Sequence, residues 1–224
     1  MVVSPGVGSM GPRPLVIIGA GGFGREVLDI IESLGGGAYE FLGFLDDGTP
    51  DEPLMAARSA RHLGPLSSLV DIDADYVVAV ANPDVRRRID AFANGLGRVA
   101  PVLVHPSAYV GSLVTLGPGT VICPHATMTT NITVGRHGQI HVNTAIGHDA
   151  VLEDYVTVLP GSNVSGNVRL EVGVTLGTNS SVIQGCRVGA GTTVGAGAAV
   201  VRDIEPGVTA VGVPARPRIA NPDD

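Results

Sequence analysis

An aliphatic residue recurs at every sixth position from residue 110 to residue 200, and this period constrains the fold more than any other feature of the sequence. The repeat runs through sixteen consecutive hexads without an insertion. Self-similarity at a fixed short period is typical of a solenoid, in which each repeat buries its apolar residue against its neighbours. The sixteen residues are Val110, Leu116, Ile122, Met128, Val134, Ile140, Ile146, Leu152, Val158, Val164, Leu170, Leu176, Val182, Val188, Val194 and Val200.

A period of six predicts short strands joined by turns, with one large side chain per hexad pointing inward. Three such faces close a triangular coil of about 18 residues, and about five coils stack at the strand spacing of about 4.8 Å. Glycine follows the aliphatic residue at seven positions, where we expect a corner with positive φ or a close approach of the backbone. These glycines are Gly111, Gly117, Gly135, Gly147, Gly177, Gly189 and Gly195.

Composition favours a thin, repetitive fold and excludes several classes of partner. The chain has 32 Gly and 4% aromatic residues, which is little bulky side chain for a core of 224 residues. The net charge of −7 and the absence of a basic stripe argue against nucleic acid. Neither a membrane span nor a signal-peptide pattern is present, so we expect a cytoplasmic protein without a membrane partner. Cys123 and Cys186 have no spacing motif and are predicted to be reduced apolar fillers.

The first half of the chain predicts a nucleotide-binding α/β domain. An apolar strand at residues 15–18 runs into GAGGFG at residues 19–24, which satisfies G-x-G-x-x-G, and a helix is predicted over residues 25–34. A second strand over residues 41–45 ends in Asp46 and Asp47. Glycines at a strand-to-helix turn let an anionic or ribosyl ligand approach backbone N–H groups. An acidic residue after the second strand can accept hydrogen bonds from a ribose or a base.

The length of this domain favours a mononucleotide or nucleotide-sugar ligand over a dinucleotide. Only a strand at 76–80, a helix at 84–93 and a strand at 99–104 follow before the repeats begin near residue 108. The dinucleotide fold uses two mononucleotide halves, and this chain has room for one. Glycines that serve only the turn and helix packing remain an alternative. We therefore expect a disordered leader at 1–14, a Rossmann-like domain at 15–105, a β-helix at 106–218 and a tail at 219–224.

The hexads and the closing segment GVPAR at residues 212–216 resemble the hexapeptide-repeat acyltransferases. The added Gly-rich α/β domain makes the chain similar to the NeuD/PglD-like family of sialic acid O-acetyltransferases and nucleotide-aminosugar N-acetyltransferases. The resemblance implies a left-handed β-helix, a homotrimer and acetyl-CoA lying in the groove between subunits. It also implies that the nucleotide sugar contacts Gly21, Gly22, Phe23, Asp46, Asp47 and Ala81. Phe23 and Ala81 stand where bacillosamine-type enzymes have His and Gly, so the particular nucleotide stays open.

Acetyl transfer to an amine or a hydroxyl needs a base near the acceptor and donors for the developing oxyanion. His148 is followed directly by Asp149, and a carboxylate beside an imidazole can fix its tautomer and support the imidazolium. The segment NTAIGHD at residues 143–149 resembles the N-T-x-x-x-H-[ED] active-site segment of the family. The resemblance makes His148 the general base, has Asp149 orient it, and lets Asn143 help position the acceptor.

The same resemblance implies a set of acetyl-CoA contacts. Thr157 stands where many family members have a second histidine that contacts the thioester oxygen. Gly166, Thr178 and Ala196 correspond to groove residues beside the pantetheine arm. The cations available for the phosphates of CoA are Arg202, Arg216 and Arg218.

Rival functions differ in the residues that they require. A zinc site of the γ-carbonic anhydrase type needs two histidines five residues apart, and the spacings among His125, His137, His141 and His148 are 12, 4 and 7, so we expect no metal. An NAD-dependent oxidoreductase lacks an evident hydride site. The expected function is therefore acetyl-CoA-dependent N-acetylation of a nucleotide-linked 4-amino-deoxy sugar. O-acetylation of a sugar or sialic acid hydroxyl, and a noncatalytic trimeric nucleotide-sugar-binding protein, are the alternatives.

Overall fold

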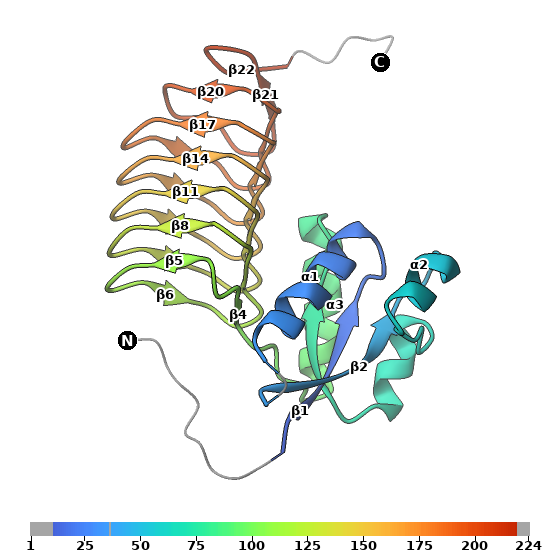
Figure 1. Cartoon of the computed structure of the whole chain (residues 1–224). Helices are drawn as coiled ribbons and strands as arrows, with labels where there is room; N and C mark the ends of the chain where they lie inside the picture. The colour runs from blue at the N-terminus through green and yellow to red at the C-terminus, as the bar shows by residue number, and fades with distance from the viewer. Residues whose placement is uncertain (1–10, 36, 219–224) are drawn as a thin grey trace. The chain divides into compact units, whose positions relative to one another are not determined.

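The computed structural model describes residues 11–35 and 37–218 and divides the chain into two compact units, with the boundary after Pro106. The first unit is an α/β domain and the second is a parallel β-helix (Figure 1). The predicted fold class is therefore confirmed. Residues 1–10 of the expected leader and the expected tail at 219–224 lie outside the described residues.

A small parallel sheet organises the α/β domain. Its strands have the order β2-β1-β3, and residues 15–18 of the central strand are at most 3% exposed, as expected for a parallel strand covered on both faces. The elements are β1 (Arg13–Ile18), α1 (Gly22–Ser33), β2 (Tyr39–Leu45), α2 (Glu52–Ala57), the 3₁₀-helix η1 (Leu66–Asp71), β3 (Asp75–Val78) and α3 (Pro83–Gly95).

Helices cover this sheet with apolar residues at helical spacing. Helix α1 packs on β1 and β2 and buries Val27, Leu28, Ile30 and Ile31. Helix α3 contributes to a cluster with the strands, and burial of such side chains contributes about 25 cal/mol per Å² of apolar surface. The members of this cluster from β1, β3 and α3 are Val16, Ile18, Tyr76, Val78, Ile89 and Ala93.

The α/β domain differs from the prediction at several element boundaries. Strand β1 begins at Arg13, inside the expected leader, and α1 begins three residues before the predicted start. The strand predicted over 99–104 is reduced to β4 (Leu103–Val104), although the carbonyl of Val99 accepts a hydrogen bond from the backbone N–H of Tyr76 at 3.0 Å. Helices α2 and η1 were not predicted, because six residues are too few to display a helical period.

The β-helix contains one two-residue strand per hexad, and each of the sixteen aliphatic residues is the second residue of its strand. From Ile122 onward these residues are at most 2% exposed, whereas Val110 and Leu116 in the first coil are half-buried. The strands are β5 (Tyr109–Val110), β6 (Thr115–Leu116), β7 (Val121–Ile122), β8 (Thr127–Met128), β9 (Thr133–Val134), β10 (Gln139–Ile140), β11 (Ala145–Ile146), β12 (Val151–Leu152), β13 (Thr157–Val158), β14 (Asn163–Val164), β15 (Arg169–Leu170), β16 (Thr175–Leu176), β17 (Ser181–Val182), β18 (Arg187–Val188), β19 (Thr193–Val194) and β20 (Ala199–Val200).

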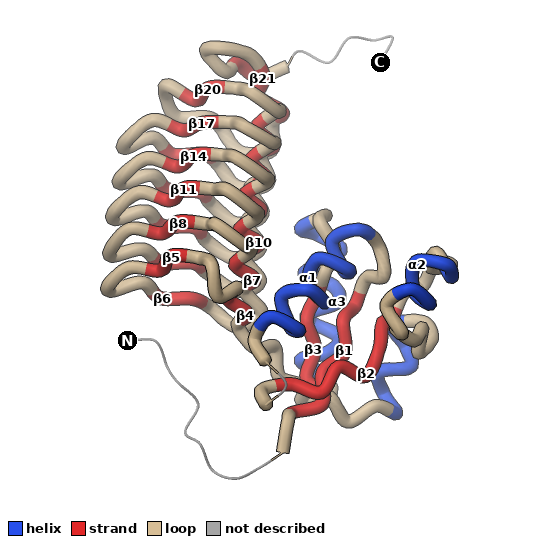
Figure 2. Tube along the Cα trace, in the orientation of Figure 1, coloured by secondary structure: helices blue, strands red, loops and turns tan. Residues whose placement is uncertain are grey.

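Each strand from β5 to β17 pairs in parallel with the strand one full coil further along the chain, as the pairing of Ile140 with Val158 illustrates. The strands therefore stack into three columns, one of which runs from β5 through β8, β11, β14 and β17 to β20 (Figure 2). At the end of the stack, β21 (Thr209–Val211) pairs with β19, and β22 (Arg216–Pro217) returns antiparallel to β21. The predicted triangular coil of three hexads is confirmed.

Left-handed backbone also recurs with the period of six, at the third residue after each inward aliphatic side chain from Val110 to Val194. Every sixth residue from 113 to 197 has a positive φ, between 52° and 77°. Gly and Asn tolerate this conformation best, and they occupy ten of the fifteen positions. The others are Leu113, His125, His137, Asp149 and Tyr155.

The glycines that follow the aliphatic residues have a different role. None of these seven glycines has a positive φ, and the expectation of a left-handed corner at these positions was therefore wrong. The close approach of the backbone is confirmed instead. A Cβ atom at Gly147 would lie 2.6 Å from the backbone nitrogen of Gly166, and one at Gly177 would lie 2.6 Å from that of Ala196. The spacing between coils excludes a side chain there.

Neither cysteine forms a disulfide and both are buried, as filler residues would be. Within residues 11–35 and 37–218, every helix is too short or too polar to cross a bilayer.

We predict that Gly177→Ala lowers the free energy of unfolding by about 1–3 kcal/mol, because the added methyl group forces two coils apart. Gly191→Asn is the matched control, since Gly191 has a φ of 67° and open space around its Cα atom. Asn tolerates that conformation, so its effect should stay below about 1 kcal/mol. Urea unfolding monitored by circular dichroism measures both. Equal losses would contradict the distinction between the two glycine roles.

Candidate active site

His148 and Asp149 lie at the corner between β11 and β12. Asp149 has a φ of 61° and occupies one of the left-handed positions of the β-helix. Backbone hydrogen bonds hold the corner from both neighbouring coils. The N–H of Asp149 donates to the carbonyl of Thr130 at 3.1 Å, and the carbonyl of His148 accepts from the N–H of Asn167 at 2.8 Å. The two side chains therefore project from a fixed backbone.

A chain of hydrogen bonds links three side chains at this corner. Nδ1–H of His148 donates to Oδ2 of Asp149 at 2.6 Å, and Nδ2 of Asn131 donates to Oδ1 of the same carboxylate at 2.6 Å. Because Nδ1 carries the proton, the lone pair of neutral His148 resides on Nε2. The His148 and Asp149 side chains are 50% and 42% exposed, so a substrate can reach them. The arrangement is that of a general base oriented by a carboxylate.

Asp149 is held in its ionised form. The hydrogen bond from Asn131 is the largest cause that lowers the pKa of this carboxyl, followed by the hydrogen bond from His148. A carboxyl whose pKa is lower in the folded protein contributes stability above its unfolded pKa, and that contribution is lost as the pH falls through the folded value. The carboxylate therefore remains an acceptor for His148 throughout the neutral range.

Gly166 supports the imidazole ring from the next coil. A Cβ atom at Gly166 would lie 2.5 Å from Nε2 and 2.6 Å from Cε1 of His148, so the ring rests against the glycine backbone. Gly166 was predicted as an acetyl-CoA contact, and this second contact was not foreseen. Any larger residue would push the ring out of its place.

Sequence reasoning also missed Asn131. It lies one coil before Asp149, and Gly166 lies one coil after His148, so each occupies the equivalent place in an adjacent coil. The coil length was available from the period of the sequence, and applying it to polar residues would have found both. Asn131 is otherwise an ordinary corner asparagine with a φ of 54°.

The other predicted residues of the β-helix lie away from this corner within the chain. Asn143 is exposed at the preceding corner, with a φ of 57°. Thr178 and Ala196 are exposed and stacked one coil apart on another edge. Thr157 is completely buried on β13, which disfavours direct contact between its side chain and a ligand. Arg202, Arg216 and Arg218 are exposed in the last part of the described chain.

The α/β domain brings its six predicted residues to one edge of the sheet. Gly21, Gly22 and Phe23 follow β1, Asp46 and Asp47 follow β2, and Ala81 follows β3 at the carboxyl ends of three adjacent parallel strands. Open α/β sheets bind ligands at this edge. Oδ2 of Asp46 accepts a hydrogen bond from the backbone N–H of Ala20 at 2.7 Å, which ties the second strand to the glycine loop.

The glycines of this loop divide into two kinds. A Cβ atom at Gly19 would lie 2.8 Å from the carbonyl oxygen of Ala79, and Gly24 packs against the carbonyl of Gly19, so these two serve the turn and the packing of α1. Gly21 and Gly22 are exposed and have open space around them. Gly21 precedes the first turn of α1 without a side-chain cap, which leaves backbone N–H groups available to an anion.

Ala81 lies in a turn that the buried side chain of Arg86 holds in place. The guanidinium of Arg86 is completely buried and its Nη1 donates to the carbonyls of Val80 and Ala81, both at 2.9 Å. Oδ1 of Asn82 accepts from the N–H groups of Asp84 and Val85 and caps α3. These hydrogen bonds within residues 81–86 therefore fix the conformation of the loop that follows β3.

No group of three or more His, Cys, Asp or Glu side chains forms a candidate metal site in the described parts of the chain.

Comparison with known proteins identifies the family. The model of the PglD N-terminal domain matches residues 14–90. The chain is 31% identical over 165 residues to GDP-perosamine N-acetyltransferase of Escherichia coli O157:H7, a match that covers 69% of this chain and 71% of the relative.

Two solved structures extend the comparison over the fold. PerB from Caulobacter crescentus, in complex with CoA and GDP-perosamine, matches with a TM-score of 0.84 and 28% identity over 92% of this chain and 97% of that one. The acetyltransferase domain of PglB from Neisseria gonorrhoeae FA1090, in complex with acetyl coenzyme A, matches with a TM-score of 0.75 and 32% identity over 93% of this chain and 100% of that one. The chain belongs to the NeuD/PglD-like family of sugar acetyltransferases.

We predict that Asn131→Ala raises the pKa of the Asp149 carboxyl toward its ordinary value of about 3.9, because the variant removes the largest cause of the depression. Asn167→Ala is the matched control, since Asn167 occupies the same corner one coil beyond Asp149, on the side opposite to Asn131, and also has a positive φ. A pH titration of the Asp149 carboxyl by NMR measures both variants. An unchanged pKa in Asn131→Ala would show that the amide does not determine the ionisation of Asp149.

Proposed function

We propose that this protein transfers an acetyl group from acetyl-CoA to the amine of a nucleotide-linked 4-amino-deoxy sugar, with His148 as the general base. The observation that carries the proposal is the Asn131–Asp149–His148 chain, which leaves Nε2 as the basic atom on an exposed corner. The relatives from Escherichia coli O157:H7 and Caulobacter crescentus that are named as perosamine N-acetyltransferases support the choice of an amine over a hydroxyl as acceptor.

In the proposed reaction, the neutral amine attacks the thioester carbonyl carbon while Nε2 of His148 takes the proton that the nitrogen loses. The imidazolium that forms is stabilised by the Asp149 carboxylate through Nδ1–H. Backbone N–H groups would stabilise the tetrahedral oxyanion. Collapse of the intermediate breaks the C–S bond, and the leaving CoA thiolate takes up the proton from the His148 imidazolium, which restores the neutral base.

The nucleotide would bind at the carboxyl edge of the α/β sheet. The open glycines Gly21 and Gly22 offer backbone N–H groups for the diphosphate, with Phe23 beside them, and Asp46, Asp47 and Ala81 border the same edge. Acetyl-CoA would lie along the β-helix in a groove of a homotrimer. Gly166, Thr178 and Ala196 would flank the pantetheine arm, Asn143 would help to position the acceptor, and the exposed arginines near residues 202–218 would approach the phosphates of CoA.

The decisive experiment measures CoA-thiol release from acetyl-CoA with UDP-, GDP- and dTDP-linked 4-amino sugars and with free sialic acid. We expect turnover of one nucleotide-linked amino sugar, and a loss of about 100-fold or more in His148→Ala, because general bases contribute factors of about 10²–10⁴. His125→Ala is the control, since His125 is an exposed corner histidine elsewhere in the β-helix. Turnover of sialic acid alone would transfer the assignment to O-acetylation. No release with any acceptor would refute the proposal.

A second prediction concerns Gly166 and separates its support of His148 from a contact with acetyl-CoA. Gly166→Ala should lower kcat by about tenfold or more, because the new methyl group displaces the imidazole ring. In a His148→Ala background the same substitution should cost little, since no ring remains to be displaced. Equal losses in both backgrounds, with a raised KM for acetyl-CoA, would assign the whole effect to the cofactor.

A further inference from the structure

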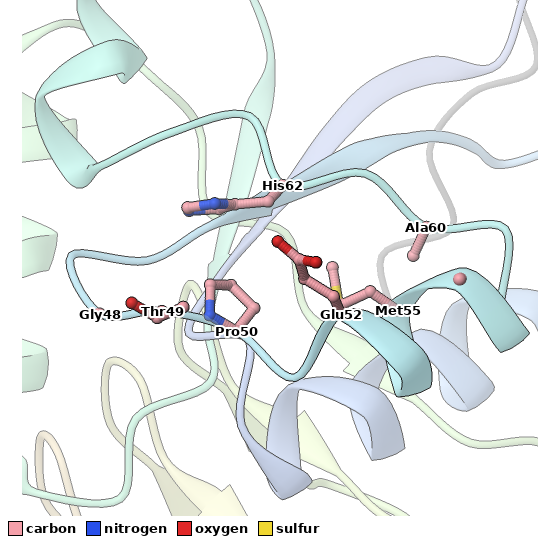
Figure 3. A pocket seen from close by; sticks show the side chains of 8 residues that line it. Gly48, Thr49, Pro50, Glu52, Met55, Ala60 and His62 are labelled. Atoms are coloured by element: carbon pink, nitrogen blue, oxygen red, sulfur yellow. The ribbon is translucent and has the colours of Figure 1, made fainter.

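A cavity of about 400 Å³ opens beside the carboxyl end of β2 in the α/β domain. The loop at residues 48–50, helix α2 and His62 enclose it (Figure 3). This volume lies within the range of small-molecule sites, about 300–1,000 Å³. Pro50 and Met55 supply apolar walls, and the side chains of Glu52 and His62 also line the cavity.

The cavity is connected to the glycine loop through Asp46. Nε2–H of His62 donates to the carbonyl of Asp46 at 3.0 Å, and the N–H of Gly48 donates to Oδ1 of Asp46 at 2.8 Å. The other carboxylate oxygen of Asp46 accepts from Ala20 in the glycine loop. The glycine loop, Asp46 and the cavity therefore follow one another within this domain, which is the order of diphosphate, ribose and base in a nucleotide.

The carboxylate of Glu52 belongs to the lining of the cavity. No ion pair or side-chain hydrogen bond involves its carboxylate among the described residues, so both oxygens are available to a ligand. Guanine presents two adjacent donors, N1–H and the N2 amino group, which a carboxylate can accept together. Uracil and thymine present a single N–H between two carbonyl oxygens, which a carboxylate repels. Adenine presents an acceptor nitrogen beside its amino group.

We propose that this cavity binds the nucleobase of the sugar nucleotide and that Glu52 makes guanine the preferred base. The proposal rests on the proposed function only in that a nucleotide-linked substrate is bound by this domain. Pro50 and Met55 contact the faces of the ring, and the imidazole of His62 stacks beside it. Glu52 determines specificity and takes no part in acetyl transfer.

The test is a calorimetric titration of the full-length protein with GDP, UDP, dTDP and ADP in the absence of acetyl-CoA. GDP is expected to bind at least about tenfold more tightly than the other three. Glu52→Gln should weaken GDP binding by about tenfold and leave UDP binding unchanged or stronger, because the amide turns a donor toward the donors of guanine. Glu40→Gln, an exposed glutamate near the start of β2, should leave all four affinities unchanged.

Equal affinities for GDP and UDP, no binding of any nucleotide, or an unchanged GDP affinity in Glu52→Gln would overturn the proposal. The binding assay separates this result from the transferase assay. Selective GDP binding without CoA release would refute acetyl transfer and retain the base site. Turnover of a UDP-linked amino sugar without a preference for GDP would refute the base site and retain acetyl transfer.

Discussion

The parallel hydrogen-bonded register between residues one coil apart is the interaction on which the β-helix and its candidate site depend. It stacks inward aliphatic residues on aliphatic residues, and it also stacks corners on corners. A side chain at a corner therefore has one neighbour above and one below that the register alone selects. His148 and Asp149 receive a supporting glycine from one coil and an amide donor from the other in this way. The site is as rigid as the sheet pairing that creates it.

The same register explains why glycine occurs in two distinct places in the hexad. At the left-handed corner, glycine relieves a backbone conformation that side chains resist. Directly after the inward residue, it leaves space for the backbone of the next coil. Substitution by Asn separates the two roles, since Asn suits the corner and cannot occupy the contact between coils.

Periodic features could be predicted from the sequence, and features that depend on single contacts could not. The sixteen strands, the coil length and the pairing of His148 with Asp149 follow from spacing and adjacency. The role of Asn131 was not predicted, because it depends on a contact between coils and because the residue itself resembles any other corner asparagine. Helix α2 was not predicted because a six-residue helix has no detectable period. The cavity beside it was not predicted because the conformation of the loop before the helix depends on the cap at Asp51.

The register also makes the coil a unit of evolutionary change. Insertion of a whole coil moves everything beyond it by one strand spacing, about 4.8 Å, and leaves each side chain on its face. Insertion of a single residue turns every later residue of that strand to the opposite face. The stacked core can therefore lengthen or shorten only in steps of complete coils, and shorter insertions are confined to loops that leave the coil. The distance from the His148 corner to the closing β21–β22 hairpin consequently changes only in steps of one strand spacing.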